Sequence, residues 1–157
     1  MLAILFLFGF SLHNMEEALW LPAWSEKAEK YQTAVNETEF RFALIIVTAV
    51  GYLLTFQYIL FSETNSLSGF LYYSFILMMI LNVIFPHLAA TIALRTYAPG
   101  LLTGLLLIMP FGLAILIKNI HSPKEAGILI VSTIILSVIM ILFIKVLFRI
   151  GRNILPE

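Results

Sequence analysis

The chain has 157 residues and no net charge; 61% of its residues are hydrophobic and only 11% are charged. Its mean hydropathy is +1.01, whereas soluble domains are about half apolar and about a quarter charged, which argues against an ordinary soluble enzyme. No basic excess is present to attract nucleic acid, and no cysteine is present to form disulfides or thiolate metal sites. The composition instead indicates a chain whose solvent is lipid.

Five apolar segments follow one another along the chain, each near the ~20 residues that a helix needs to cross a bilayer core. They cover residues 2–24, 40–61, 67–94, 99–117 and 126–148, and a polar loop at 25–39 separates the first two. No basic residue precedes the first segment and no small-residue cleavage site follows it, so we expect a retained helix and not a signal peptide. The sequence predicts one domain, an all-α membrane bundle of about five helices.

Lysine and arginine are unevenly divided between the two sides of the membrane that five crossings create. The side with the first loop, the third loop and the C-terminus collects Lys27, Lys30, Arg41, Arg95, Lys145, Arg149 and Arg152, whereas the other side holds Lys118 and Lys124. Positively charged loops stay cytoplasmic. We therefore expect a multi-pass protein of the cell inner membrane with its N-terminus outside and its C-terminus in the cytoplasm.

Ionisable residues inside membrane helices are costly, so each of them is a candidate for function. In the first segment Glu16 and Glu17 follow His13 by three and four residues. At ~100° per residue the two carboxylates flank the imidazole on one face of a helix. The arrangement predicts that this helix carries a polar site within the membrane.

A second histidine, His87, is predicted to reach the same depth as His13. Both helices run from outside to inside; His13 lies eleven residues before Trp24, and His87 lies eight residues before Arg95. At ~1.5 Å per residue the two imidazoles differ in depth by only a few ångströms. We expect them to face one another in a shared site.

The sequence also resembles a known family. The opening motif is carried by the run His13-Asn14-Met15-Glu16-Glu17, followed by Trp20, Pro22 and Trp24. A later motif is carried by residues 82–87 and by Tyr97-Ala98-Pro99-Gly100. Both are similar to the HXXEE family of small integral membrane proteins. The resemblance implies a multi-helix membrane fold with His13, Glu16 and Glu17 as signature positions, and it implies no reaction.

Two imidazoles and two carboxylates form a ligand set that suits zinc, iron or manganese. A divalent cation would neutralise carboxylates that could not both stay ionised when buried. Because Glu16 lies deeper than Glu17, we expect His13, Glu16 and His87 to bind the metal. Glu17 and His87 are the expected catalytic groups, with Glu17 exchanging protons. Haem is disfavoured as a cofactor because two histidine ligands would leave both carboxylates unexplained.

Three further polar residues are secondary candidates for the site. Asn82 lies ~140° around an ideal helix from His87, but a kink at Pro86 could bring the two together. The alternative is that Asn82 hydrogen-bonds a neighbouring helix. Thr91 belongs to the same polar group of the third segment, and Tyr52 of the second segment is a candidate only for a supporting role.

Three functions are consistent with these residues. The first is a membrane-embedded, metal-assisted enzyme, whose partners are membrane lipid and a lipid-like or isoprenoid small molecule that enters from the inner leaflet. The second is a metal-free acid–base isomerase that uses Glu16 and His87, and the third is a proton-coupled carrier. A structural explanation remains beside them: Glu16 and Glu17 could reach the inner interface and pair with basic residues there.

Overall fold

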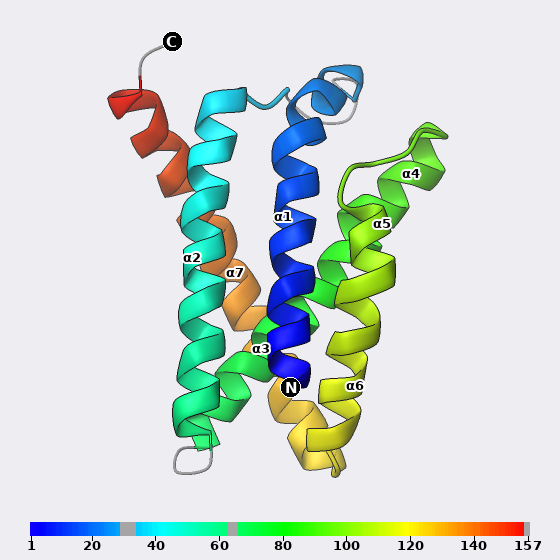
Figure 1. Cartoon of the computed structure of the whole chain (residues 1–157), viewed down its shortest axis with the longest axis vertical. Helices are drawn as coiled ribbons and strands as arrows, with labels where there is room; N and C mark the ends of the chain where they lie inside the picture. The colour runs from blue at the N-terminus through cyan, green and yellow to red at the C-terminus, as the bar shows by residue number, and fades with distance from the viewer. Residues whose placement is uncertain (29–33, 63–65, 156–157) are drawn as a thin grey trace.

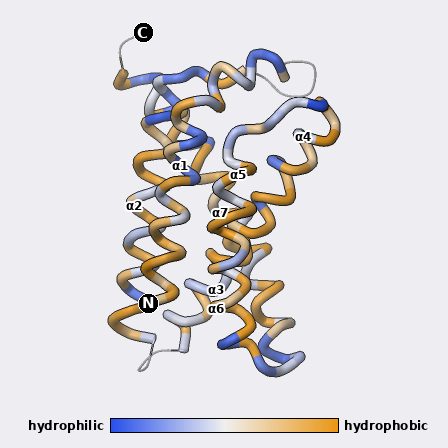
Figure 2. The backbone as a smooth tube through the Cα atoms, turned by 45° about the vertical axis from the view of Figure 1, so that its right-hand side comes forward, coloured by the Kyte–Doolittle hydropathy of each residue, from blue (hydrophilic) through white to orange (hydrophobic). Residues whose placement is uncertain are grey.

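The computed structural model describes residues 1–28, 34–62 and 66–155, and the regular elements in these ranges are helices. Five helical spans in the described ranges are long and apolar enough to cross a membrane. Figure 1 shows these spans packed side by side, and Figure 2 shows polar residues gathered at the two ends of an otherwise hydrophobic bundle. The chain is a multi-pass membrane protein, and the predicted fold class, an all-α membrane helix bundle, is confirmed.

The first two spans are the continuous helices α1, Leu2–Lys27, and α2, Glu37–Phe61. The side chain of Asn36 accepts hydrogen bonds from the amides of Thr38 and Glu39 and so caps α2. Both helices extend into the predicted loop at 25–39 because polar residues can continue a helix beyond its apolar part. Residues 29–33, including Lys30, lie outside the described residues.

The third span is bent in its middle. It consists of α3, Ser66–Asn82, the π-helical segment η1, Val83–Leu88, and α4, Ala89–Leu94. The backbone leaves the helical conformation at Phe85, where φ is −136° and ψ is 114°. A residue that precedes proline is disfavoured in the α region, and Pro86 itself has no N–H to donate. The bend lies next to His87.

The fourth span begins with α5, Leu101–Thr103, and continues through the π-helical segment η2, Gly104–Ile108, into α6, Met109–Asn119. It begins two residues later than the predicted start at 99. The reason is Gly100, whose φ of 95° lies in the left-handed region and cannot be part of a right-handed helix. The chain therefore turns at Gly100 before it enters the membrane again.

The fifth span, α7, covers Pro123–Ile154 and extends beyond both ends of the predicted segment 126–148. Its first turn is fixed by a capping box, in which Ser122 and Glu125 each accept a hydrogen bond from the other's backbone amide. At its other end Arg152 forms an ion pair with Glu39 of α2. These polar interactions explain why α7 is longer than its apolar part.

The aromatic core of the bundle lies between α1 and α3. Phe6 packs edge to face on Tyr72 and Phe75, and Phe10 packs edge to face on Phe75 at a centroid distance of 5.1 Å. All four rings are buried. Edge-to-face pairs of this kind add stabilisation beyond that of area burial, so the core fixes α1 against α3 on one side of the two histidines.

Gly9 is the position where α1 approaches η2 most tightly. A Cβ atom added at Gly9 would lie 2.8 Å from the Cβ atom of Leu107, which the backbone holds in place. We expect Gly9→Ala to separate the two helices and to lower the free energy of unfolding by about 1–3 kcal/mol. Thermal unfolding of the protein in detergent, followed by circular dichroism, measures this loss.

The matched control is Gly127→Ala on α7, where an added Cβ atom would meet no other atom within 4 Å. This variant should unfold at or above the temperature of the parent protein because alanine favours helix over glycine. Equal unfolding temperatures for the two variants would contradict the close approach of α1 and η2.

Candidate functional site

His13 of α1 and His87 of η1 lie against one another inside the bundle. Both side chains are buried, and the rings pack edge to face with a centroid distance of 5.1 Å and an interplanar angle of 88°. The sequence predicts this juxtaposition from the equal depth of the two residues. Two imidazoles in contact within a membrane bundle are the centre of the candidate site.

The carboxylate of Glu17 completes a group of three potential metal ligands. Its Oε1 atom lies 3.0 Å from Nε2 of His87 and 3.7 Å from Nε2 of His13. One donor atom from each residue lies within 4.8 Å of the other two. Donor atoms that share a zinc-like ion at ~2.0–2.2 Å are separated by roughly 3–4 Å. The observed spacing fits such an ion with only small side-chain movements.

A backbone hydrogen bond defines which nitrogen of His13 faces this group. Nδ1 of His13 lies 3.0 Å from the carbonyl oxygen of Gly100, so Nδ1–H donates to that oxygen. The other nitrogen, Nε2, then carries the lone pair and faces Glu17. Metal-binding histidines in proteins are commonly held in this way, with the second ring nitrogen bonded to a carbonyl or a carboxylate.

Asn82 also reaches the two histidines. Its Nδ2 atom lies 3.1 Å from Nε2 of His87 and 3.5 Å from Nε2 of His13. The bend at Phe85 and Pro86 places Asn82 and His87 on the same side, although an ideal helix would separate them by ~140°. The amide can donate to an imidazole nitrogen, or, turned over, can present its oxygen to a cation.

Glu16 points away from this group and contacts the start of the fourth span. Its carboxylate accepts hydrogen bonds from the amide of Gly100 at 2.8 Å and from the amide of Thr103 at 3.2 Å. The hydroxyls of Thr103 and Tyr97 donate to it as well. The first N–H groups of a helix lack partners within the helix and carry partial positive charge. Glu16 is therefore a helix cap that comes from another helix.

This placement differs from the sequence-based assignment, which gave Glu16 to the metal and proton exchange to Glu17. In the structure Glu17 is the carboxylate between the histidines, and the oxygens of Glu16 are taken up by four donors. The physical reason is the start of the fourth span, which offers Glu16 donors that the first helix alone does not reveal.

Tyr97 joins the loop between α4 and α5 to Glu16. Its hydroxyl donates to the Glu16 carboxylate and accepts a hydrogen bond from the amide of Leu102 at 3.0 Å. Burial and the hydrogen bond to Glu16 raise the pKa of Tyr97 to about 12. The hydroxyl therefore keeps its proton, and its role as a donor, throughout the neutral pH range.

Gly100 covers the two imidazoles with its backbone. A Cβ atom added at this position would lie 2.6 Å from Cε1 of His87 and 2.9 Å from Cε1 of His13. Its φ of 95° is also a conformation that other residues rarely adopt. Both the turn and the close approach thus require glycine here.

The remaining secondary candidates have supporting roles. The hydroxyl of Thr91 accepts a hydrogen bond from the amide of Ala98 and holds the loop that leads to Gly100. The hydroxyl of Tyr52 forms a hydrogen bond with that of Ser11 and joins α2 to α1.

The sequence does not predict the contact of Thr103 with Glu16. Two features of the sequence could have predicted this contact: a buried Glu16 carboxylate that needs hydrogen-bond donors, and the start of the fourth span, whose amides need acceptors.

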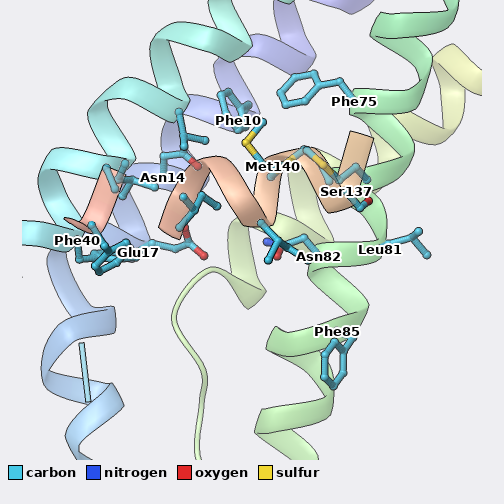
Figure 3. Close-up of a pocket in the computed structure, with 18 residues that line it drawn as sticks. Phe10, Asn14, Glu17, Phe40, Phe75, Leu81, Asn82, Phe85, Ser137 and Met140 are labelled. Carbon is cyan, nitrogen blue, oxygen red and sulfur yellow. The ribbon is translucent and has the colours of Figure 1, made fainter. Parts of the chain in front are cut away.

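An apolar cavity of about 360 Å³ adjoins the site. Residues of α1, α2, α3, η1 and α7 line it, and its polar side chains are those of Asn14, Glu17, Asn82 and Ser137. Figure 3 shows Glu17 and Asn82 extending into this space from different helices. Glu17 and Asn82, which both contact the two histidines and form the histidine cluster with them, are thus part of the cavity wall. A molecule in the cavity would contact these two side chains directly.

The model of a family described as "Protein of unknown function with HXXEE motif" matches residues 4–115. The chain belongs to the HXXEE family. It is also 40% identical over 155 residues to a protein described as "Uncharacterized protein YrkK" from Bacillus subtilis (strain 168), with 96% of each chain covered. No solved structure matches. The span that the HXXEE model matches contains both histidines, both glutamates, Asn82 and the loop that covers them.

The two adjacent glutamates should differ in their effect on stability. Glu16→Ala leaves the amides of Gly100 and Thr103 without their acceptor, and each buried donor left unpaired costs about 1–3 kcal/mol. Glu17→Ala removes no helix cap, so we expect a much smaller loss. Thermal unfolding in detergent with a chelator present, so that no metal contributes, gives the comparison. Equal losses would contradict the capping role of Glu16.

Proposed function

We propose that this HXXEE protein is a membrane-embedded, metal-assisted enzyme that acts on a lipid-like or isoprenoid substrate. The observation that carries the proposal is the convergence of His13 Nε2, His87 Nε2 and Glu17 Oε1, because Glu17 also lines an apolar cavity. Ionisable groups are costly in a membrane interior unless they serve a function. A cation at this point would pair with the carboxylate and lie within reach of a molecule in the cavity.

The ligand set favours zinc, iron or manganese. Two imidazoles and one carboxylate, without a thiolate, are typical of these ions. Three protein ligands leave a coordination position free for water or substrate, as in catalytic sites, and a metal bound there would polarise an oxygen of the substrate. In this proposal Glu17 is the metal-binding carboxylate, and Glu16 positions the loop whose carbonyl group holds His13.

A metal-free acid–base enzyme, such as a double-bond isomerase, is the second candidate. One observation favours it, namely the contact of 3.0 Å between Glu17 Oε1 and His87 Nε2. A carboxylate and an imidazole at hydrogen-bond distance can pass a proton between them. Here Glu17 and His87 would be the catalytic pair.

We also propose that the protein lies in the cell inner membrane with its N-terminus outside and its C-terminus in the cytoplasm. The proposal is supported by basic residues at the end of the bundle where α1 and α7 end and α2 begins: Lys27, Arg41, Arg149 and Arg152. Lys118 and Lys124 lie at the opposite end, between α6 and α7. Because positively charged ends face the cytoplasm, the proposal puts the histidine site in the inner-leaflet half.

Elemental analysis of the detergent-purified protein tests the metal site. We expect zinc, iron or manganese at about one ion per chain, because three donor atoms converge on one point. His13→Ala and Glu17→Gln should each remove the ion, since each variant deletes a ligand. Glu16→Gln should retain it, because the glutamine oxygen still accepts hydrogen bonds at the start of α5.

Two results would count against this assignment. Retention of the metal by Glu17→Gln together with its loss from Glu16→Gln would restore the sequence-based roles of the two residues. A parent protein that takes up none of the three ions, even when they are supplied during purification, would favour the acid–base candidate.

Reporter fusions test the orientation. A green fluorescent protein fused after Glu157 should fluoresce, because the basic C-terminal end is expected in the cytoplasm. Alkaline phosphatase inserted after His121, in the loop between α6 and α7, should be active because that loop is expected outside. The reverse pattern at these two positions would overturn the proposed orientation.

A further inference from the structure

We infer that the substrate is an amphiphile with a single apolar chain and an uncharged head group, and that it enters the cavity from the lipid through an opening between η1 and α7. This inference rests on the proposed function, because it treats the cavity beside the histidines as the substrate site. It adds the charge of the head group, the number of chains and the route of entry.

The charges in the cavity wall argue for an uncharged head group. Among the described residues that line the cavity, Glu17 is the one acidic group, and none is lysine, arginine or histidine. Proteins bind phosphate with arginine or lysine side chains or with the N-terminus of a helix. The helix start near this site, that of α5, is already taken by the carboxylate of Glu16. A phosphate head group would therefore meet a carboxylate and no cationic side chain among the described lining residues. A divalent ion held by Glu17 would keep about one positive charge after pairing with that carboxylate, which does not balance the charge of about −1.5 to −2 on a phosphate monoester.

The polar groups that do face the cavity suit a hydroxyl or a carbonyl group. Asn14, Asn82 and Ser137 offer neutral amide and hydroxyl groups, which donate and accept hydrogen bonds without demanding a charge. Asn82 links the cavity to the histidines, because its amide nitrogen also lies 3.1 Å from Nε2 of His87. A head group bonded to Asn82 would thus lie beside the histidine cluster.

The size of the cavity argues for a single chain. Its volume of about 360 Å³ lies near the lower end of the roughly 300–1,000 Å³ found for small-molecule sites. Phe10 and Phe75 belong to its wall and to the buried aromatic core, where their rings are in edge-to-face contact. This core closes the cavity toward the N-terminal end of α1, so a second acyl chain would have no space there.

The opening toward lipid is marked by residues that line the cavity and are also exposed. Leu81 is 48% exposed, Phe85 is 76% exposed and Ile141 is 54% exposed. Figure 1 shows α3 and α7 crossing behind α1 and diverging toward the end where α1 ends. Figure 3 shows Phe85 on the bent part of the third span, at the edge of the cavity. These exposed lining residues belong to α3, η1 and α7 and therefore mark a lateral entrance in the proposed inner leaflet.

Photoaffinity labelling with two matched probes tests the inference. The first probe is a medium-chain fatty alcohol with a diazirine in its chain, and the second is the phosphate monoester of the same alcohol. We expect the alcohol to label the cavity wall of the full chain in phosphatidylcholine vesicles, as mapped by mass spectrometry. The phosphate should label that wall at least about tenfold less, because the described lining side chains offer it no lysine or arginine to balance its charge.

Two tryptophan substitutions on α7 show whether the label comes from the cavity. Met140→Trp fills the cavity and should abolish labelling of its wall. Leu142→Trp, at a position that is 57% exposed and not among the cavity residues, should leave labelling unchanged. Ser137→Phe gives a second, smaller obstruction in case Met140→Trp does not fold. Equal labelling by the two probes, or labelling that persists in the folded obstructed variants, would overturn the inference.

The same samples separate this inference from the proposed function. Selective labelling by the alcohol in a protein without bound metal would support the substrate class and route while the metal proposal fails. Bound metal together with preferential labelling by the phosphate would overturn the substrate class and leave the metal site in place.

Discussion

The contact between the Glu16 carboxylate and the start of the fourth span is the interaction on which the rest of the site depends. A carboxylate buried in a membrane needs donors, and the first amides of a helix need acceptors. In this protein each satisfies the other, through the amides of Gly100 and Thr103. With that end of the chain fixed, the Gly100 carbonyl accepts the Nδ1 proton of His13. One carboxylate that accepts hydrogen bonds from the start of another span thus holds the covering loop and, through Gly100, orients an imidazole.

The bend in the third span is the second constraint. Pro86 and the extended conformation of Phe85 place His87 and Asn82 on the same side of the span, where both approach His13. Phe85, at the bend, lines the cavity together with residues of α7. Residues at or next to the bend thus contribute to both features: Asn82 contacts the histidines and lines the cavity, and Phe85 lines the cavity.

The sequence predicts the fold more fully than the site. Five spans and the all-α class follow from the length and spacing of the apolar segments, because lipid leaves helices few alternatives. The pairing of His13 with His87 follows from equal depth. The sequence does not predict which of Glu16 and Glu17 lies between the histidines. A helix fixes the angle of ~100° between the two side chains, but it does not determine which neighbouring helix each of them faces. That choice depends on where the loop before Gly100 folds back, which is a long-range property. The direction of the bend at Pro86 is also set by packing.

Three methionines, Met78, Met79 and Met140, line the cavity together with its aromatic and aliphatic residues. Their side chains are unbranched and polarisable, and they adapt to irregular shapes at little cost. The polar end of the cavity, at Glu17 and Asn82, adjoins a more constrained region. The His13 ring beyond it is held by a backbone hydrogen bond, and Gly100 approaches both imidazoles closely. The two ends therefore differ in kind, because the methionines can adapt to apolar groups of different shape whereas the polar end is bounded by constrained side chains. Under the proposed function, a substrate could vary more in its apolar part than in its polar part.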